Sequence, residues 1–281
     1  MEKLSNPKVT IEIIQKYNFA FQKRFGQNFL IDGHVIEKII RAAEITKDDV
    51  VLEIGPGIGT MTQYLAEAAG EVFAVEIDKN LLPILAETLA EYDNVTVVNE
   101  DILKVDIAAL TGGRPVKVVA NLPYYITTPI IMGLFENHIP ATSITVMVQK
   151  EVADRIAAVP GNKTYGGYTA KLGLYAQVTG RFEVPPRCFM PAPHVDSAVV
   201  RIDRVDGVVP EGLDREFVAR VIDAAFAQRR KTIRNSMSAN GFAKDVLDAA
   251  FEACGIAPTT RAETLGVADF VCLARELSHD A

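Results

Sequence analysis

The stretch VVLEIGPGIG, residues 50–59, joins a short, mostly apolar run to three closely spaced glycines. A run of this length and character is typical of a buried strand. After it, Met61, Tyr64, Leu65 and Ala68 recur on one face of a helix. Strand, glycine loop and helix together are typical of the ligand-binding turn of a doubly wound sheet, where glycines let backbone N–H groups approach a ligand.

The residues at the ends of the next two predicted strands indicate which ligand binds at this turn. The strand at 71–75 ends in Glu76, an acid placed to bind both hydroxyls of a ribose. The strand at 95–98 is followed by Asp101, which can accept an adenine amino group, and by Ile102, which can lie against the ring. The spacing is G-x-G-x-G with Thr60 next, so the dinucleotide form G-x-G-x-x-G fails. These features fit an adenosine-containing cofactor.

Strands and helices alternate through the first half of the chain. This alternation predicts a mostly parallel sheet covered by helices on both faces. We expect strands at 50–54, 72–76, 95–98, 116–120 and 143–148, with helices at 60–69, 79–91 and 127–137 between them. Two helices should precede this region, one beginning at Asn6-Pro7 and one capped by Asp32.

The pattern changes after residue 157. Runs at 172–178 and 198–202 are strand-like and could complete the sheet as a hairpin, and four prolines at 184–193 predict an extended arm between them. From Leu213 onward only helical periodicity is present. We therefore expect two domains, residues 1–206 and 207–281, with the second small and helical.

The fourth strand runs into Asn121-Leu122-Pro123-Tyr124, which predicts a pocket for an amino group on a flat ring. The Asn121 side-chain oxygen and the Leu122 carbonyl can each accept an N–H bond of that amino group. Pro123 makes the turn rigid because its ring fixes φ, and Tyr124 can stack on the ring of the substrate. Methylation of an aromatic amine, whose nitrogen is a poor nucleophile, requires such a set.

Composition narrows the classes of protein further. The chain has 281 residues, 49% hydrophobic content and a net charge of −7, which disfavours indiscriminate binding of nucleic acid. No apolar run is long enough to span a bilayer, and the N-terminus lacks the apolar core of a signal peptide. We expect a cytoplasmic monomer that contacts no membrane.

Cysteine and histidine usage predicts no metal site. The three cysteines are odd in number and far apart, which is typical of reduced thiols in the cytosol: Cys188, Cys254 and Cys272. The four histidines are also scattered: His34, His138, His194 and His279.

Local basic runs indicate surfaces for RNA phosphate. One contains Lys23 and Arg24 beside aromatic and amide residues. Between Arg220 and Arg234, five Lys or Arg residues stand against one acid, Asp223. One-sided charge of this kind favours phosphate contact over a merely solvated helix face. The RNA-binding residues we expect are Lys23, Arg24, Phe189, Arg229, Arg230, Lys231 and Arg234.

Several blocks of the sequence resemble the ribosomal RNA adenine N6,N6-dimethyltransferases, specifically the bacterial 16S type. The matching blocks span most of the chain: KRFGQNFL at 23–30, VLEIGPGIGTMT at 51–62, VEID at 75–78, NLPYYITTPII at 121–131, MVQKEVADRI at 147–156, VPPRCFMPAPHVDSAVVRI at 184–202, FAQRRKTIRN at 226–235 and RAETL at 261–265. The glycine block is common among methyltransferases, whereas the 184–202 and 226–235 blocks are far more specific.

The resemblance implies a class I methyltransferase fold, Rossmann-like with a seven-stranded, mostly parallel sheet, plus a helical C-terminal domain that contacts the RNA or the ribosome. It implies S-adenosylmethionine as the cofactor. The implied substrate is a pair of adjacent adenosines near the 3′ end of 16S rRNA, each methylated twice in the small subunit during its assembly.

The resemblance also assigns residues to the site. The cofactor would be bound by Gln27, Asn28, Leu30, Gly55, Gly57, Glu76, Ile77, Asp101, Ile102 and Asn121. The amino group of the substrate would be held by Asn121, Leu122, Pro123 and Tyr124.

Two other functions remain open from the sequence. One is the 23S rRNA adenine methyltransferase type associated with macrolide resistance, which shares the N-terminal blocks. The 184–202 and 226–235 blocks favour the 16S type. The other is a checkpoint factor in ribosome assembly whose methylation activity is secondary.

Overall fold

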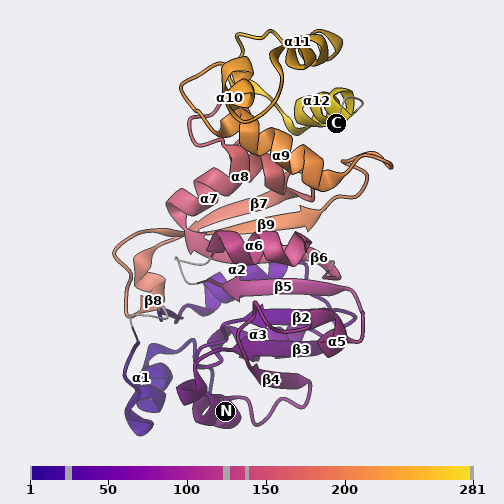
Figure 1. Cartoon of the computed structure of the whole chain (residues 1–281). Helices are drawn as coiled ribbons and strands as arrows, with labels where there is room; N and C mark the ends of the chain where they lie inside the picture. The colour runs from indigo at the N-terminus through magenta and orange to yellow at the C-terminus, as the bar shows by residue number, and fades with distance from the viewer. Residues whose placement is uncertain (1, 23–26, 123–126, 137–138, 279–281) are drawn as a thin grey trace. The chain divides into compact units, whose positions relative to one another are not determined.

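The computed structural model describes residues 2–22, 27–122, 127–136 and 139–278. Helices and strands follow one another along the chain as shown in Figure 1. The strands are β1 (Phe29–Leu30), β2 (Val50–Ile54), β3 (Glu71–Glu76), β4 (Val95–Asn99), β5 (Val116–Asn121), β6 (Ala141–Gln149), β7 (Ala176–Val184), β8 (Phe189–Met190) and β9 (Ser197–Arg204).

The helices alternate with the strands in the first half of the chain and stand alone after β9. They are α1 (Pro7–Lys16), α2 (Gly33–Ala42), α3 (Thr60–Ala68), α4 (Leu82–Thr88), α5 (Ile107–Thr111), α6 (Thr127–Glu136), α7 (Lys150–Ile156), α8 (Gly167–Leu172), α9 (Arg215–Phe226), α10 (Ile233–Ala239), α11 (Lys244–Ala253) and α12 (Val267–Ser278). Short 3-10 turns lie at Lys79–Leu81, Pro186–Cys188 and Ala262–Thr264.

Seven strands form one sheet in the order β4-β3-β2-β5-β6-β9-β7. The pairs that join β4, β3, β2, β5 and β6 are parallel, and β9 pairs with β6 antiparallel. The predicted mostly parallel, seven-stranded sheet is therefore confirmed. Chain order reverses direction between β2 and β5, because β3 and β4 lie on one side of β2 and the later strands lie on the other.

The register of the central strands brings their carboxyl ends level. Ile54 at the end of β2 lies opposite Val75 of β3 and Ala120 of β5. The residues that follow these positions, Gly55, Glu76 and Asn121, therefore emerge at the same edge of the sheet. Ligands bind at this edge in doubly wound folds, at the point where strand order reverses.

Predicted helix starts are present in the structure. The Asn6 side chain accepts a hydrogen bond from the Lys8 backbone N–H, and Pro7 occupies the first turn. Asp32 accepts from the N–H groups of His34 and Val35 and so caps α2. One apolar cluster then joins α2 and α3 to the sheet through Ile36, Ile39, Leu65, Val51 and Val119.

The chain separates into two compact units. Unit 1 comprises residues 1–153 and 178–204, and unit 2 comprises 154–177 and 205–281. The boundary near residue 205 lies close to the expected one, whereas 154–177 belongs with the C-terminal helices instead of the first domain. The physical reason is burial: Tyr165, Ala170 and Leu174 pack into the same core as α9. The run at 172–178, expected as a strand, contains the end of α8 and only the start of β7.

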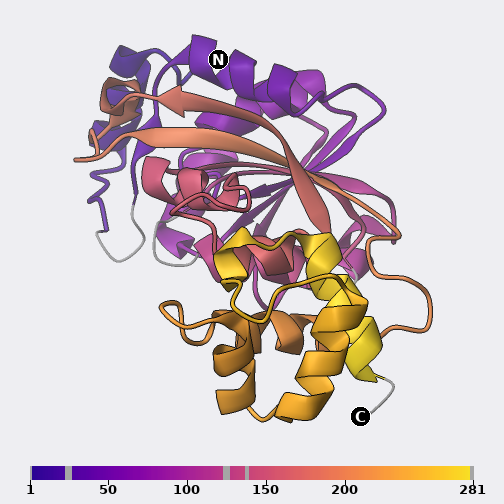
Figure 2. The ribbon, with the colours of Figure 1, turned by 90° about the horizontal axis from the view of Figure 1, so that it is seen from above.

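Unit 2 has its own hydrophobic core. Its C-terminal helices, α9 to α12, lie together in the orange and yellow part of Figure 2. Their fully buried side chains include Val218, Ile222, Met237, Phe251 and Phe270. A separate core of this kind is what defines an independent structural unit.

The expectation of three reduced thiols is wrong for two of the cysteines. Cys254 at the end of α11 and Cys272 in α12 form a disulfide, with their Cα atoms 6.0 Å apart. The spacing of the cysteines in the sequence does not indicate this disulfide. The two positions come together only because α11 packs against α12. Cys188 is a buried free thiol.

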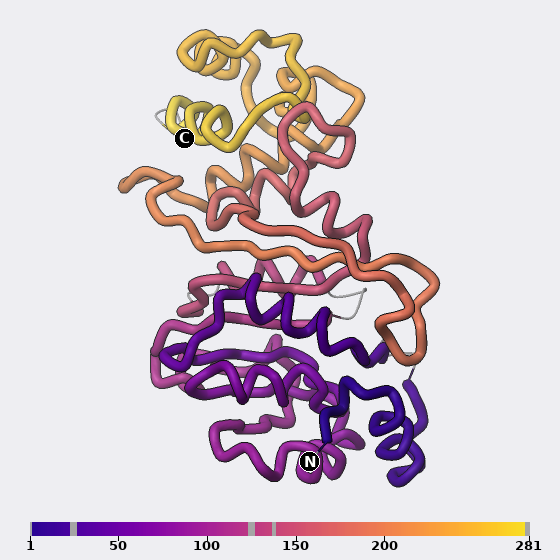
Figure 3. The backbone as a smooth tube through the Cα atoms, turned by 180° about the vertical axis from the view of Figure 1, so that it is seen from behind, coloured from indigo at the N-terminus to yellow at the C-terminus, as the bar shows by residue number. Residues whose placement is uncertain are grey.

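The proline-rich arm closes onto the N-terminal segment of unit 1. Strand β8 pairs antiparallel with β1, with Phe29 opposite Met190 and Leu30 opposite Phe189. In Figure 3 the arm folds back beside the start of the chain. Phe189 is only 4% exposed and packs in the cluster that contains α2 and α3. This pairing fixes the position of β1.

We predict that Phe189→Ala destabilises unit 1 and loosens β1. Truncation of a buried phenylalanine leaves a cavity and should lower the free energy of unfolding by about 3–5 kcal/mol. Val195→Ala in the same arm is the control, because this side chain is 44% exposed and should change stability by less than about 0.5 kcal/mol. Denaturant unfolding compares the two variants. Equal midpoints would show that Phe189 does not anchor the arm.

Candidate functional site: a cavity at the carboxyl edge of the sheet

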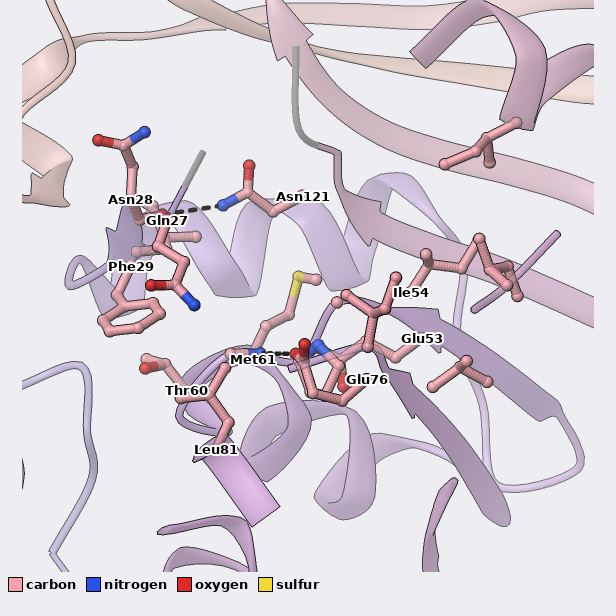
Figure 4. Close-up of a pocket in the computed structure, with 18 of the residues that line it drawn as sticks. Gln27, Asn28, Phe29, Glu53, Ile54, Thr60, Met61, Glu76, Leu81 and Asn121 are labelled. Carbon is pink, nitrogen blue, oxygen red and sulfur yellow. Dashed lines mark hydrogen bonds between the residues drawn. The ribbon is translucent and has the colours of Figure 1, made fainter. Parts of the chain in front are cut away.

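A cavity of about 1000 Å³, its open mouth included, lies at the carboxyl edge of the sheet in unit 1. Figure 4 shows that its walls come from the strand ends, the glycine loop and the segment at β1. Its lining contains all ten residues expected to bind a cofactor: Gln27, Asn28, Leu30, Gly55, Gly57, Glu76, Ile77, Asp101, Ile102 and Asn121. The strand ends and the family resemblance together thus pointed to the residues of this cavity.

The glycine loop forms the floor of the cavity. Gly57 has a φ of +61°, which disfavours any residue with a side chain. A Cβ atom at this position would also lie 2.9 Å from the ring of Phe29. Glycine is therefore required both by the backbone conformation and by the close approach of the β1 segment.

Glu76 is held rigidly at the end of β3. Its carboxylate accepts hydrogen bonds from the Gly57 N–H at 3.2 Å and from the Asp78 N–H at 2.8 Å. Burial raises the pKa of Glu76 to about 7, against the lowering effect of these backbone bonds. Each carboxylate oxygen keeps a lone pair that can accept a further hydrogen bond. The group is thus oriented for the two hydroxyls of a ribose.

Apolar and acidic side chains also line the cavity after the ends of β3 and β4. Ile77 is 51% exposed, an unusual state for a large apolar side chain beside a buried strand. Asp101 accepts from the Leu103 backbone N–H at 3.0 Å, which fixes its carboxylate in the loop after β4. Ile102 lines the same region. An apolar surface next to a fixed acceptor is suited to a flat, amino-bearing ring.

The β1 segment is tied to the cavity at two points. Asn121 donates its side-chain N–H to the Asn28 carbonyl at 3.1 Å, as the dashed line in Figure 4 marks. Gln27 donates to the Asp78 carboxylate at 2.9 Å. Because the Asn121 amide nitrogen is engaged with Asn28, its amide oxygen is the atom oriented to accept a hydrogen bond from a ligand.

Sequence reasoning missed part of the lining. Phe29, Glu53, Thr60 and Met61 all face the cavity. Glu53 stands inside a buried strand, where a carboxylate is unusual, and that was the one available signal. Burial raises the pKa of Glu53 to about 8.

Four expected site residues lie outside the described residues. Pro123 and Tyr124, assigned to the amino-group pocket, fall in the 123–126 gap. Lys23 and Arg24, assigned to RNA, fall in the 23–26 gap. Leu122 is described and is 1% exposed, and its N–H donates to the Met147 carbonyl at 3.1 Å.

The residues expected to bind RNA differ in what their side chains contact. Arg229, Arg230 and Lys231 are exposed in the turn after α9. Arg234 instead makes two 2.6 Å hydrogen bonds to Asp248, which joins α10 to α11. Phe189 is buried and packs against α2 and α3, so its side chain is not exposed for the expected contact with RNA. The described residues contain no cluster of three or more potential metal ligands.

Comparison with known sequences decides the family. The model of the ribosomal RNA adenine dimethylase family matches residues 18–279. The chain belongs to the ribosomal RNA adenine dimethylase family. It is accordingly an S-adenosylmethionine-dependent rRNA adenine dimethyltransferase, as the sequence resemblance implied.

Two curated relatives of the dimethylase are similar over nearly their whole length. A ribosomal RNA small subunit methyltransferase A from Lachnoclostridium phytofermentans is 56% identical over 98% of this chain and 97% of its own. The protein of the same name from Bacillus mycoides is 46% identical over 99% and 98%.

Solved structures of similar proteins agree with the fold of the dimethylase. A dimethyladenosine transferase from Plasmodium falciparum aligns with a TM-score of 0.78 and 25% identity, covering 89% of this chain and 98% of that one. The 23S rRNA methyltransferase ErmE aligns with a TM-score of 0.73 and 28% identity, covering 89% and 100%. The fold of this chain is thus shared with a dimethyladenosine transferase and with a 23S rRNA methyltransferase.

We predict that Glu76→Ala weakens S-adenosylmethionine binding by about 1–3 kcal/mol, because two charge-assisted hydrogen bonds to the ribose are lost. Glu76→Gln should lose less, since the amide oxygen can still accept one hydrogen bond. Calorimetric titration measures both affinities, with Glu12→Ala on the exposed face of α1 as the control. Unchanged affinity in Glu76→Ala would remove Glu76 from the cofactor site.

Proposed function

We propose that this enzyme dimethylates the N6 nitrogens of two adjacent adenosines near the 3′ end of 16S rRNA, in the small ribosomal subunit during its assembly. The observation behind this proposal is the near full-length identity to two small subunit methyltransferases, 56% and 46%. The large-subunit alternative shares the fold, at 28% identity to ErmE.

On this proposal the enzyme works as a cytoplasmic monomer. None of the described helices combines the length and the apolar character that crossing a bilayer requires.

The cavity is the proposed cofactor site. Its side chains suit an adenosine linked to methionine: the Glu76 carboxylate accepts from the ribose hydroxyls, the Asp101 carboxylate accepts from the adenine amino group, and the exposed Ile77 packs on a face of the ring. Ile102 would pack on the ring, while Gln27, Asn28, Leu30, Gly55 and Gly57 would enclose the remainder. When bound, the cofactor supplies a methyl group already activated by its sulfonium.

Asn121 is the proposed centre of the amino-group pocket. Its side-chain nitrogen is fixed on the Asn28 carbonyl, so its oxygen can accept one N–H of the target amine and turn the nitrogen lone pair toward the cofactor site. The Leu122 carbonyl would accept the second N–H in the first transfer, and Pro123 and Tyr124 would shape and stack the base. Accurate positioning of this kind can supply about 7–11 kcal/mol of the barrier lowering, so no strong base is required.

Unit 2 is the proposed RNA-contacting domain. Arg229, Arg230 and Lys231 present positive charge on an otherwise acidic protein. Arg234 orients this turn through its ion pair with Asp248 and is a secondary candidate for phosphate contact. The net charge of −7 means that such a local surface, rather than the protein as a whole, would attract rRNA.

The test of the proposed function is methylation of unmethylated small subunits with labelled S-adenosylmethionine, followed by digestion to nucleosides. We expect N6,N6-dimethyladenosine from two adjacent positions of 16S rRNA and none from large subunits. Asn121→Ala should lose most of the single-turnover rate at saturating subunits, because the target amine is no longer oriented.

The matched control in this assay is Asn162→Ala, a loop amide in unit 2 outside the cavity. Wild-type single-turnover rate in Asn121→Ala would make Asn121 a structural residue. Methyl label found only in 23S rRNA would show that the substrate is the large-subunit rRNA and not 16S rRNA.

We predict that replacing Arg229, Arg230 and Lys231 together with Ala weakens small-subunit binding and flattens its salt dependence. Each lost phosphate contact removes roughly one released counterion, so the slope of log affinity against log salt should fall by up to about 2–3. Lys8→Ala with Lys38→Ala, both exposed in unit 1, is the control for loss of positive charge elsewhere. An unchanged slope in the triple variant would leave these three residues as a solvated surface.

A further inference from the structure

The cofactor cavity has an extreme distribution of charge. Among the described residues that line it, four bear a carboxylate and none is lysine, arginine or histidine. The four acids are Glu53, Glu76, Glu100 and Asp101. A cavity lined by one sign of charge favours a ligand of the opposite sign, and more strongly where water is excluded.

Glu53 is the most unusual of these acids. Its side chain is 0% exposed, it stands in the middle of the sheet on β2, and it borders the cavity. Neither carboxylate oxygen has a partner in ordinary hydrogen-bond geometry among the described residues, and a weaker interaction with the Thr62 hydroxyl only partly opposes the rise in the pKa of Glu53. A buried charge without a partner is unstable, so such a group is either neutral or awaits a cation.

Among the residues that the structure describes, no lysine, arginine or histidine acts on the pKa of Glu53. Its neighbours in register are Ala74 on β3 and Val119 on β5. On β3 the nearest acid along the strand is Glu76, and α3 presents the buried hydroxyls of Thr60 and Thr62. Charged groups on the neighbouring elements interact elsewhere: Lys117 with Asp49, Glu71 with Arg114, Glu37 with Arg41, Glu67 with Lys3, and Lys38 with the ring of Phe182.

The cofactor and its product differ in net charge, which is the property that an acidic cavity distinguishes. S-adenosylmethionine has a positive sulfonium, whereas S-adenosylhomocysteine, left after methyl transfer, has a neutral thioether. The ammonium, carboxylate, ribose and adenine groups are common to both. A negative, water-poor cavity therefore distinguishes the two ligands by charge alone.

We propose that Glu53 is a specificity-determining residue that ionises when the cationic cofactor binds, and so makes the cavity prefer S-adenosylmethionine over its neutral product. This inference rests on the proposed assignment of the cofactor to this cavity. The consequence concerns the release of S-adenosylhomocysteine, which must leave before each new methyl transfer. Because this product lacks the sulfonium charge, the attraction between the ligand and the ionised Glu53 is lost after transfer.

The titration of the buried acids gives the direction of the pH dependence. Burial raises the pKa of Glu53 to about 8 and the pKa of Glu76 to about 7 in the free protein, and the Glu76 carboxylate adds to the rise at Glu53. A bound cation favours the ionised carboxylate and lowers these pKa values. Cofactor binding therefore releases protons at neutral pH, and cofactor affinity rises with pH up to about 8 and then levels. Product affinity should change less.

The test is calorimetric titration of the wild-type protein with each ligand, in two buffers of different ionisation enthalpy, between pH 6 and 9. We expect proton release with S-adenosylmethionine and less with S-adenosylhomocysteine. In Glu53→Gln the ratio of the two affinities at pH 8 should fall by about tenfold, the effect of one pKa unit of coupling. Glu12→Gln removes the same charge from an exposed site and should leave the ratio unchanged.

Equal proton release for both ligands in the wild-type protein would overturn the proposal, as would an unchanged affinity ratio in folded Glu53→Gln. The wild-type proton count decides the matter even if Glu53→Gln does not fold. Failure of the cofactor assignment is distinguishable, because then the affinity of neither ligand would respond to Glu76→Ala.

Discussion

The parallel pairing of β2 with both β3 and β5 is the constraint on which the rest of the site depends. It sets Ile54 level with Val75 and Ala120, so the glycine loop, Glu76 and Asn121 emerge at one edge of the sheet. A shift of one residue in either pair would turn these side chains to the other face, because side chains alternate along a strand. The hydrogen bonds from Gly57 to Glu76 and from Asn121 to Asn28 are possible only in this register.

A second constraint is the closure of the arm onto the start of the chain. The pairing of β8 with β1 holds the Asn28 carbonyl where the Asn121 amide can reach it. Asn28 and Asn121, 93 positions apart in sequence, thus form part of one wall of the cavity. The acidic side chains that line the cavity make the enclosed space suited to a cation.

Much of this could be predicted from sequence where the signal is local. The apolar run at 50–54, its glycines and the acid after β3 each follow from strand and loop chemistry, and all ten expected cofactor residues line one cavity. What escaped prediction depends on contacts distant in sequence. The β1–β8 pair, the burial of Phe189, the packing of 154–177 with the C-terminal helices and the Cys254–Cys272 disulfide all arise from tertiary packing.

The measurement that tests the central claim most directly is a crystal structure of the protein with S-adenosylhomocysteine and adenosine. The account predicts the ribose of the ligand on the Glu76 carboxylate, its adenine beside Asp101, and the amino group of the added adenosine on the Asn121 oxygen, with the Asn121–Asn28 hydrogen bond intact. A ligand bound away from the glycine loop, or an Asn121 side chain turned from the cavity, would contradict it.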